Sequence, residues 1–291
     1  MRTHTILACT LTALCAAALL THAIFAQTPA QTPRAGKQDN NQAHPPFKIV
    51  GNVYYVGTNN LASLLITTPE GNILINSDFE RSVPLIRASI EKLGFKFSDT
   101  KILLGSHAHN DHQEGDAMVK ELTGAQVMAM EQDVPALKAM TPGGKPHPVD
   151  RILHDGDQVT LGGATLVAHL TPGHTKGCTT WTMKVQEGNT SHDLLLLCSI
   201  GVNANFVLVN NKDYPQIADD YVRSFKTLRA LPCDVCLGSH AEFYGLDEKY
   251  ARLQKGGPNP FIDRPGYLAH LDLQEKNFKA KLEEQKKAAS N

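Results

Sequence analysis

This sequence lacks an excess of charge of either sign. Lysine and arginine number 28 against 29 aspartates and glutamates, which leaves a formal net charge of −1. No stripe of basic residues is present, so the chain lacks the electrostatic footprint of a nucleic-acid-binding protein. No short-period internal repeat occurs either, which excludes an array of stacked repeats. We therefore expect no nucleic acid among the partners of this protein.

The first 26 residues carry one charge, that of Arg2, ahead of an apolar stretch over residues 6–25. A polar, proline-containing segment follows Ala26, and this order is typical of a signal peptide cleaved near that alanine. A membrane anchor is the alternative, but the stretch is only weakly hydrophobic. We expect a periplasmic protein, without a membrane attachment after cleavage, that divides into a signal peptide over 1–26, a flexible segment over 27–46 and a single domain over 47–291.

Cleavage would leave 265 residues, enough for one sizeable core, and four of the six cysteines. These four allow three complete pairings, and export makes disulfides possible. Cys233 and Cys236 resemble half of a redox or zinc motif, but no second pair is present. In a strand leading to His240, thiols three residues apart would point to opposite faces. We therefore expect Cys233 and Cys236 to be structural cysteines.

Residues 107–112 read HAHNDH and supply four potential metal ligands in six positions. The segment follows the apolar run 101–104, so it begins just past the C-terminal end of a strand. Its first two histidines are two residues apart and point to one side of an extended chain. The adjacent Asp111 and His112 diverge at the start of a helical stretch and can reach a different ion. One segment can therefore serve two metal ions.

Two distant histidines, His174 and His240, each follow a turn that contains glycine. Together with residues 107–112 they provide six ligands, which suffice for two zinc ions with three protein ligands each. Imidazole and carboxylate form the ligand set of hydrolytic zinc, which lowers the pKa of bound water to about 7. The scattered histidines are expected to be structural instead: His44, His147, His154, His192 and His270.

The three segments together resemble the metallo-β-lactamase superfamily, whose signature is His-x-His-x-Asp-His. Residues 170–175, LTPGHT, look like the second metal segment of that family, and residues 237–240, LGSH, look like its last. The resemblance extends over nearly the whole chain that follows the signal peptide. It implies the following ligands: His107, His109 and His174 for the first zinc ion, and Asp111, His112 and His240 for the second.

The segment after the apolar strand 194–197 separates the members of this family. Glyoxalase-II-like, lactonase-like and RNA-processing members place a metal-bridging aspartate there, and this chain has none. It has Ser199 at the expected position and His112 beside Asp111, which is similar to subclass B3. Some members of this subclass also link the positions of Cys178 and Cys198 by a disulfide. A thiolate ligand role for Cys198 is the alternative.

Short strands and outer helices predict the fold. Apolar strands over 52–58, 62–67 and 71–76 are separated by turns and predict an antiparallel meander. A helix opens at Pro84, a second batch of strands follows the metal motif, and the last helix starts near Pro265. Strands in two batches predict an α+β fold, an αβ/βα four-layer sandwich with two antiparallel-rich sheets and the metals at one edge between them.

These features predict a monomeric metallo-β-lactamase that hydrolyses the β-lactam amide bond of penicillins, cephalosporins and carbapenems, and so confers antibiotic resistance. The resemblance implies two Zn²⁺ per monomer and a small β-lactam as the partner. A metal-bound hydroxide, oriented by Asp111 as the catalytic residue, would attack the strained amide carbonyl. Ser199 and Asn203 are the candidate contacts to substrate, directly or through water.

Two other functions stay open. One is a hydrolase of the same fold that acts on a thioester or a lactone, which the missing bridging aspartate makes less favourable. The other is a non-catalytic exported zinc-binding protein, which the complete set of six ligands makes less favourable still. The glycine- and proline-rich loop 141–147 is expected to flank the substrate groove.

Overall fold

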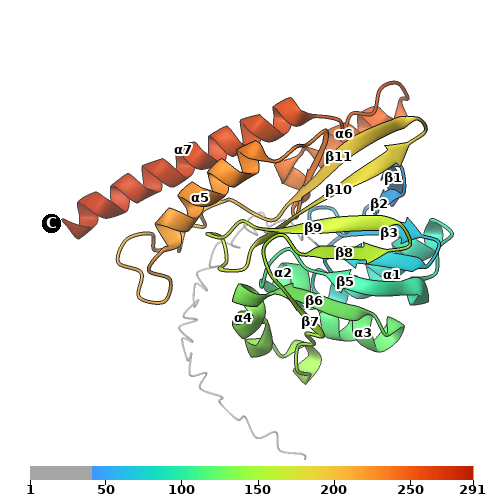
Figure 1. Ribbon diagram of the computed structural model, residues 1–291, viewed down its shortest axis with the longest axis horizontal. Coiled ribbons are helices and arrows are strands. Elements are labelled where there is room, and N and C mark those ends of the chain that lie inside the picture. The colour runs from blue at the N-terminus through green and yellow to red at the C-terminus, as the bar shows by residue number, and fades with distance from the viewer. Residues whose placement is uncertain (1–40, 291) are drawn as a thin grey trace, which may run out of the picture. The chain divides into compact units, whose positions relative to one another are not determined.

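The computed structural model describes residues 41–290 (Figure 1). The expected signal peptide and residues 27–40 of the expected flexible segment lie outside the described residues. The rest of that segment contacts the domain, because Ala43 forms an isolated β-bridge with Thr58. The ring of His44 lies 5.2 Å from that of Tyr55 and 4.9 Å from that of Tyr250. The folded domain therefore begins before residue 47.

A seven-stranded sheet, with its strands in sequence order, forms the first half of the domain. The three expected strands correspond to β2–β4, and the short strands β1 and β7 were not expected. The pairs up to β3–β4 are antiparallel, and those from β4–β5 onward are parallel. The bounds are β1 (Phe47–Val50), β2 (Val53–Tyr55), β3 (Leu64–Thr68), β4 (Gly71–Ile75), β5 (Thr100–Leu104), β6 (Gln126–Met130) and β7 (Arg151–Leu153).

The second sheet has five strands in the order β12-β11-β10-β9-β8. All its pairs are antiparallel except the parallel pair β11–β12. Both sheets are therefore mixed. The bounds are β8 (Gln158–Leu161), β9 (Ala164–Leu170), β10 (Thr179–Glu187), β11 (Thr190–Leu197) and β12 (Val235–Gly238).

The leucine run in β11 explains how the layers pack. Leu194 and Leu196 point into the core between the two sheets, whereas Leu195 and Leu197 point to the helices on the other face. Successive side chains of a strand alternate between its faces, so a strand that is covered on both sides needs an apolar residue at every position. The unbroken apolar run is the sequence signal of an inner layer.

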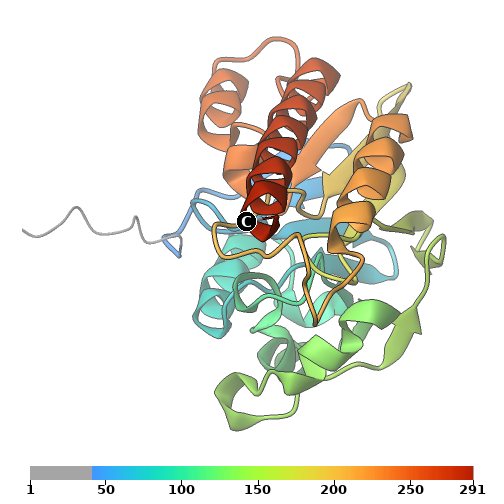
Figure 2. The same cartoon turned by 90° about the vertical axis from the view of Figure 1, so that its left-hand side faces the viewer.

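The helices complete the four layers that the sequence predicts (Figures 1 and 2). Two helices, α1 and α3, cover the outer face of the first sheet, and α5 and α7 cover the outer face of the second. None of the helices between residues 41 and 290 combines the length and apolar character that a bilayer crossing needs. The bounds are α1 (Val83–Lys92), α2 (Asn110–Gln113), α3 (Asp116–Thr123), α4 (Val134–Ala139), α5 (Ile217–Ala230), α6 (Leu246–Gln254) and α7 (Arg264–Ala289).

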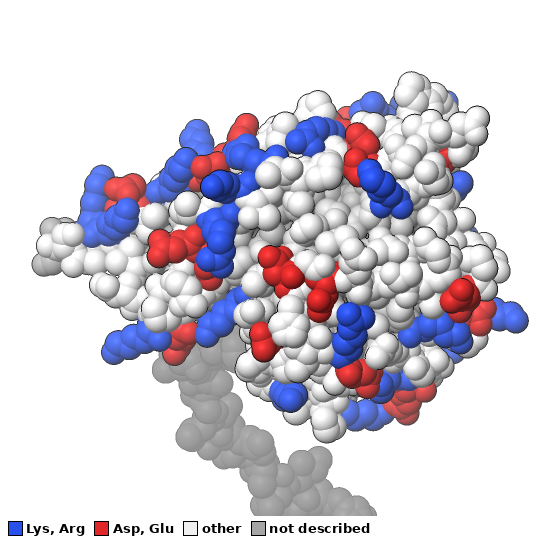
Figure 3. All heavy atoms as spheres, viewed as in Figure 1, with Lys and Arg blue, Asp and Glu red and all other residues white. Residues whose placement is uncertain are grey.

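Basic and acidic side chains are interspersed on the face of the molecule that Figure 3 shows. This distribution agrees with the balanced composition of the chain, which has 28 basic and 29 acidic residues. A mixed surface of this kind produces no strong field of one sign.

Cys233 and Cys236 form a disulfide in the structure. The expectation that their thiols point to opposite faces of one strand is wrong, because β12 begins only at Val235 and the chain bends at Asp234. This bend places the two Cα atoms 5.7 Å apart, within the usual range for a disulfide. The pair links the start of β12 to the segment that leaves α5.

Candidate metal centre

The candidate ligands lie where several strands end. Strands β9, β11 and β12 run in one direction, so their carboxyl ends meet at the same end of the second sheet. His174 follows β9 and His240 follows β12, while residues 107–112 follow β5 of the first sheet. Loops at strand ends positioned by a rigid sheet are a common place for functional residues.

Two hydrogen bonds join the sheets beside the HAHNDH segment. The backbone N–H of Thr179 donates to the carbonyl of Ser106 at 2.8 Å, and the indole Nε1 of Trp181 donates to the carbonyl of Gly105 at 3.0 Å. Gly105 has no Cβ, and a Cβ there would overlap the side-chain amide of Gln113. The glycine therefore permits the close approach that sets the direction of the segment.

His107, His109 and His174 form the first triplet. Their ligand nitrogens all lie within 4.8 Å of one another, and their ring centroids are 4.7–4.9 Å apart. Nδ1 of His174 contacts the carbonyl of Gly201 at 2.9 Å, which leaves Nε2 free to face the centre. Nδ1 of His107 contacts Ser106 Oγ at 3.1 Å, and its buried Nε2 has no hydrogen-bond partner. A buried nitrogen without a partner is costly unless a ligand satisfies it.

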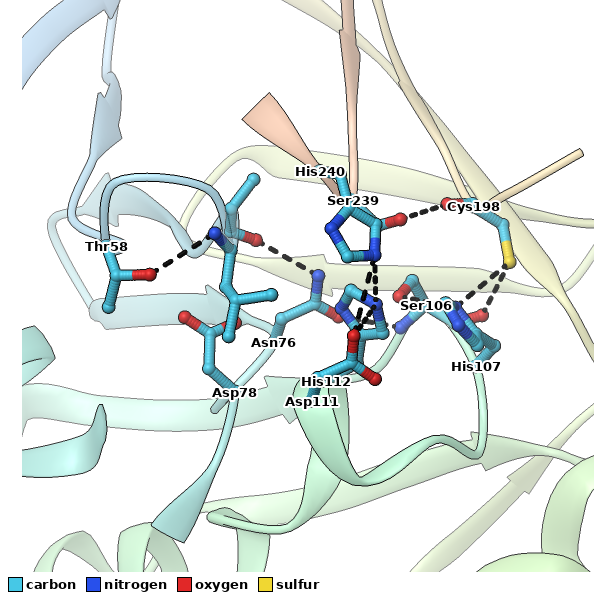
Figure 4. Close-up of polar contacts among 12 residues, drawn as sticks. Thr58, Asn76, Asp78, Ser106, His107, Asp111, His112, Cys198, Ser239 and His240 are labelled. Atoms are coloured by element: carbon cyan, nitrogen blue, oxygen red, sulfur yellow. Dashed lines mark hydrogen bonds and ion pairs between the residues drawn. The ribbon is translucent and has the colours of Figure 1, made fainter. Parts of the chain in front are cut away.

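Asp111, His112 and His240 form the second triplet (Figure 4). Asp111 Oδ2 lies 3.5 Å from Nε2 of His112 and 3.6 Å from Nε2 of His240, and these two nitrogens are 3.1 Å apart. Zinc binds nitrogen and oxygen at about 2.0–2.1 Å, which in a tetrahedral site puts two ligand atoms about 3.3 Å apart. The three atoms therefore fit one face of a zinc tetrahedron.

Burial lowers the pKa of four of these imidazoles, which favours their neutral form. Burial, reinforced by the neighbouring imidazoles, lowers the pKa of His107 and of His112 well below the usual range. Burial also lowers the pKa of His174 to about 4. For His240 burial lowers the pKa although Asp111 opposes the shift. Neutral imidazole is the form that binds a metal ion, so these histidines can bind one without first losing a proton.

Asn76 is a supporting residue that the sequence analysis missed. Its side-chain Oδ1 accepts the backbone N–H of Ser106 at 2.8 Å, and its Nδ2 donates to the carbonyl of Ala62 at 3.0 Å. The residue has φ 63°, a left-handed conformation that asparagine tolerates better than most residues. The sequence feature that could have indicated a supporting role for Asn76 is its position at the end of β4, in Ile75-Asn76-Ser77.

The proposed substrate contacts differ in their exposure. Ser199 is only 2% exposed, whereas Asn203 lies on an exposed loop between β11 and α5. Sequence analysis missed Phe206 on the same loop, although its ring centroid lies 5.4 Å from that of His174. The loop 141–147 does lie beside the HAHNDH segment, since its first residues and Asn110 line a common pocket.

Cys178 and Cys198 form a disulfide behind the first triplet. Cys198 Sγ lies 3.6 Å from Nδ1 of His107, the nitrogen that faces away from the other two histidines. The bond joins the loop of His174 to the segment that follows β11. Both sulfur atoms are thereby committed to each other, which leaves no thiolate for a metal at this point of the described chain.

Comparison with known proteins assigns the family. Residues 56–240 match the metallo-beta-lactamase superfamily. The fold is similar to that of the FEZ-1 metallo-beta-lactamase from Legionella gormanii, with 49% identity, a TM-score of 0.81 and coverage of 84% of this chain and 98% of that one. It is also similar to BJP-1, a subclass B3 metallo-beta-lactamase of Bradyrhizobium japonicum, with 39% identity, a TM-score of 0.80 and coverage of 87% and 98%.

The chain therefore belongs to the metallo-beta-lactamase superfamily, whose chemistry implies a bound metal, and it is an enzyme. Within that superfamily its fold matches subclass B3 enzymes, as the sequence resemblance implied. A hydroxyacylglutathione hydrolase of Rhodopseudomonas palustris is a more distant relative, 29% identical over 187 residues. The chain spans 64% of the length of that relative.

Proposed function

We propose that this protein hydrolyses the amide bond of β-lactam antibiotics, including penicillins, cephalosporins and carbapenems, with two zinc ions held by the two triplets. Such hydrolysis would confer resistance. The observation that carries the proposal is the pair of complete triplets at one end of the sandwich. The similarity to FEZ-1 and BJP-1, which are metallo-beta-lactamases, supports the choice of substrate.

The ions held by the two triplets and the carboxylate of Asp111 have different tasks in this proposal. Zinc bound there would supply a Lewis acid and a bound water with a pKa near about 7. Asp111 is the catalytic residue, because its carboxylate is 30% exposed and can accept a hydrogen bond from a water that enters the groove. His107 and His112 are fully buried beside it, which excludes bulk water from the inner wall of the site.

Ser199 and Asn203 are the proposed contacts to the substrate carboxylate or carbonyl. Asn203 is exposed on the loop and can reach a ligand directly, whereas the buried Ser199 would act through a bridging water. The loss of a single water-mediated contact costs far less than the loss of a catalytic carboxylate. The two kinds of residue can therefore be told apart by substitution.

A thioester substrate is the second candidate, and the hydroxyacylglutathione hydrolase relatives favour it. Against it stands the segment after β11, where the chain has Cys198 and Ser199 and no aspartate. A carboxylate at that point is the feature expected of thioesterase-like members. The non-catalytic alternative is disfavoured because none of the six ligand side chains is replaced.

We propose export to the periplasm and a monomeric enzyme as part of the same function. The apolar stretch 6–25 after Arg2 supports export. Sequencing the N-terminus of protein recovered from a periplasmic extract tests cleavage near Ala26, and light scattering during gel filtration tests the monomer.

The test of the proposed reaction is a hydrolysis assay on the wild type and two variants, each prepared with zinc. The wild type should open a chromogenic cephalosporin, lose this activity with a chelator and regain it with zinc. Inhibitors that acylate a catalytic serine should have little effect. Asp111→Ala should lower kcat/KM by about 10²–10⁴-fold, and Ser199→Ala by less than about tenfold. Equal losses in the two variants would contradict the roles assigned here.

A further inference from the structure

The loop between β11 and α5 forms one wall of the site and has no regular secondary structure of its own. It carries Asn203 and Phe206, and together with Gly173, His174 and Ile217 it lines an open pocket of about 380 Å³. A loop without strands or helices needs other contacts to keep one conformation, because ordering its backbone costs conformational entropy.

The C-terminal part of α7 supplies such contacts. Lys281 Nζ donates to the carbonyl of Asn203 at 2.6 Å and to that of Ala204 at 2.7 Å. Gln285 lies one turn further on the same face of the helix. Its Nε2 donates to the carbonyl of Phe206 at 2.8 Å, and its Oε1 accepts the backbone N–H of Leu208 at 2.6 Å. Two side chains therefore satisfy four backbone groups within residues 203–208.

The helix itself is anchored against the body of the domain. Phe278 is 1% exposed, and its ring stacks on that of Tyr221 in α5 with 5.1 Å between the centroids. The hydroxyl of Tyr221 donates to the carbonyl of Gly201 at 2.9 Å, the same carbonyl that His174 Nδ1 contacts. Gly201 of the loop and the helix that carries Lys281 are thus both held by one aromatic cluster.

Figure 2 shows the C-terminal end of α7 next to this loop. We propose that Lys281 and Gln285 are positioning residues that hold the backbone of residues 203–208 and thereby keep the pocket beside His174 in the shape that the substrate requires. Neither side chain touches the metal ligands. The identity of the substrate rests on the proposed function, whereas the holding of the loop does not.

The contacts are suited to this task. A charged ammonium that donates to two carbonyls makes stronger hydrogen bonds than a neutral group, and a glutamine amide can serve a carbonyl and an N–H together. Without Gln285 the N–H of Leu208 would lose its acceptor and open to solvent. The loop would then sample other conformations, and part of the free energy of substrate binding would be used to order it.

Hydrogen exchange on the zinc-loaded full chain tests the holding of the loop without reference to activity. The double variant Lys281→Met/Gln285→Leu should exchange the amides of Phe206 and Leu208, which donate to Asn203 and Gln285, about tenfold faster than the wild type. The control Lys286→Met should exchange as the wild type does, because Lys286 pairs with Glu283 on the same helix. Lys281→Arg alone should retain most of the protection.

Steady-state kinetics test the effect on the site. The double variant should raise KM for the hydrolysed substrate about threefold to tenfold, with kcat changed less than about twofold and with unchanged zinc content. Unchanged exchange in the double variant would overturn the proposal whatever the activity. Faster exchange with unaltered KM would overturn the link to substrate. A wild type that opens no β-lactam would refute the proposed function, and the exchange data would still decide the role of α7.

Discussion

The carboxylate of Asp133 accepts the backbone N–H of Ala108 at 2.9 Å, between the first two histidines of the HAHNDH segment. The same side chain accepts the hydroxyl of Thr175 at 2.8 Å and the backbone N–H of Gly177 at 2.7 Å, both on the loop of His174. One buried carboxylate therefore joins the two loops that carry the first triplet, although it is not itself among the candidate ligands.

Asp133→Asn should weaken zinc binding at the first triplet and activity by about 10–100-fold, the usual cost of losing a group that orients metal ligands. The amide replaces one acceptor oxygen with a donor, so it cannot accept all three hydrogen bonds. Competition with a chromophoric chelator measures the affinity. Glu131→Gln is the control, because Glu131 is exposed at the same turn. Equal affinities in the two variants would show that Asp133 does not set the geometry.

The two triplets of candidate ligands could be located from the sequence and Asp133 could not, for one physical reason. A strand end followed by HAHNDH fixes the directions of neighbouring side chains locally, and the segments of His174 and His240 repeat the pattern of strand and turn. The partners of Asp133 lie 25, 42 and 44 residues away along the chain. Only the folded arrangement brings them together.

The strands of the fold also differ in whether the sequence predicts them. The inner strands were predictable because apolar residues on both faces mark an inner layer, as in β11. The edge strands β1 and β7 are four and three residues long and leave too short a pattern. The Cys233–Cys236 pair was misread because a bend of one residue, Asp234, reverses the direction in which a thiol points.

Each triplet should hold its own zinc ion. His174→Ala and His240→Ala should each lower the zinc content of the dialysed protein from two ions to one per chain, since a site with two remaining ligands binds weakly. Elemental analysis in zinc-containing buffer measures this. His154→Ala is the control, because its side chain is 62% exposed and outside both triplets. A wild-type content that saturates at one ion would refute the two-ion account.

Both disulfides should be present in exported protein. Peptide mapping without reductant should recover Cys178 linked to Cys198 and Cys233 linked to Cys236. Replacing Cys178 and Cys198 by alanine should lower the free energy of unfolding by about 3 kcal/mol, because the bond closes a loop of some twenty residues. The matched double variant of Cys233 and Cys236 should lose less, about 2 kcal/mol. Thiols that alkylate after unfolding without reductant would contradict the pairing.

The buried pair of His147 and Asp116 should make stability depend on pH. Nε2 of His147 lies 3.2 Å from Oδ2 of Asp116. Burial works to lower the pKa of His147, but the hydrogen bond and charge of Asp116 raise it above the ordinary value of 6.5. The folded-state pKa exceeds the unfolded one, so this stabilisation is complete below pH 6.5 and is lost as the pH rises through the folded-state value.

His147→Gln should therefore cost more free energy of unfolding at about pH 5.5 than at about pH 9. Urea unfolding of zinc-free wild type and variant at both pH values measures the difference, and other titrating groups cancel because the two proteins are compared at the same pH. A cost that is equal at both values would mean that folding does not change the pKa of His147.

The metal site should open β-lactam rings in preference to thioesters. One zinc-loaded preparation should be assayed with a penicillin, a cephalosporin and a carbapenem, and in parallel with a hydroxyacylglutathione thioester, and kcat/KM compared before and after chelation. We expect chelator-sensitive hydrolysis of the β-lactams at about 10⁴ M⁻¹s⁻¹ or faster and little turnover of the thioester. Rapid thioester cleavage with all three β-lactams left intact would contradict this expectation and leave only the metal chemistry of the family.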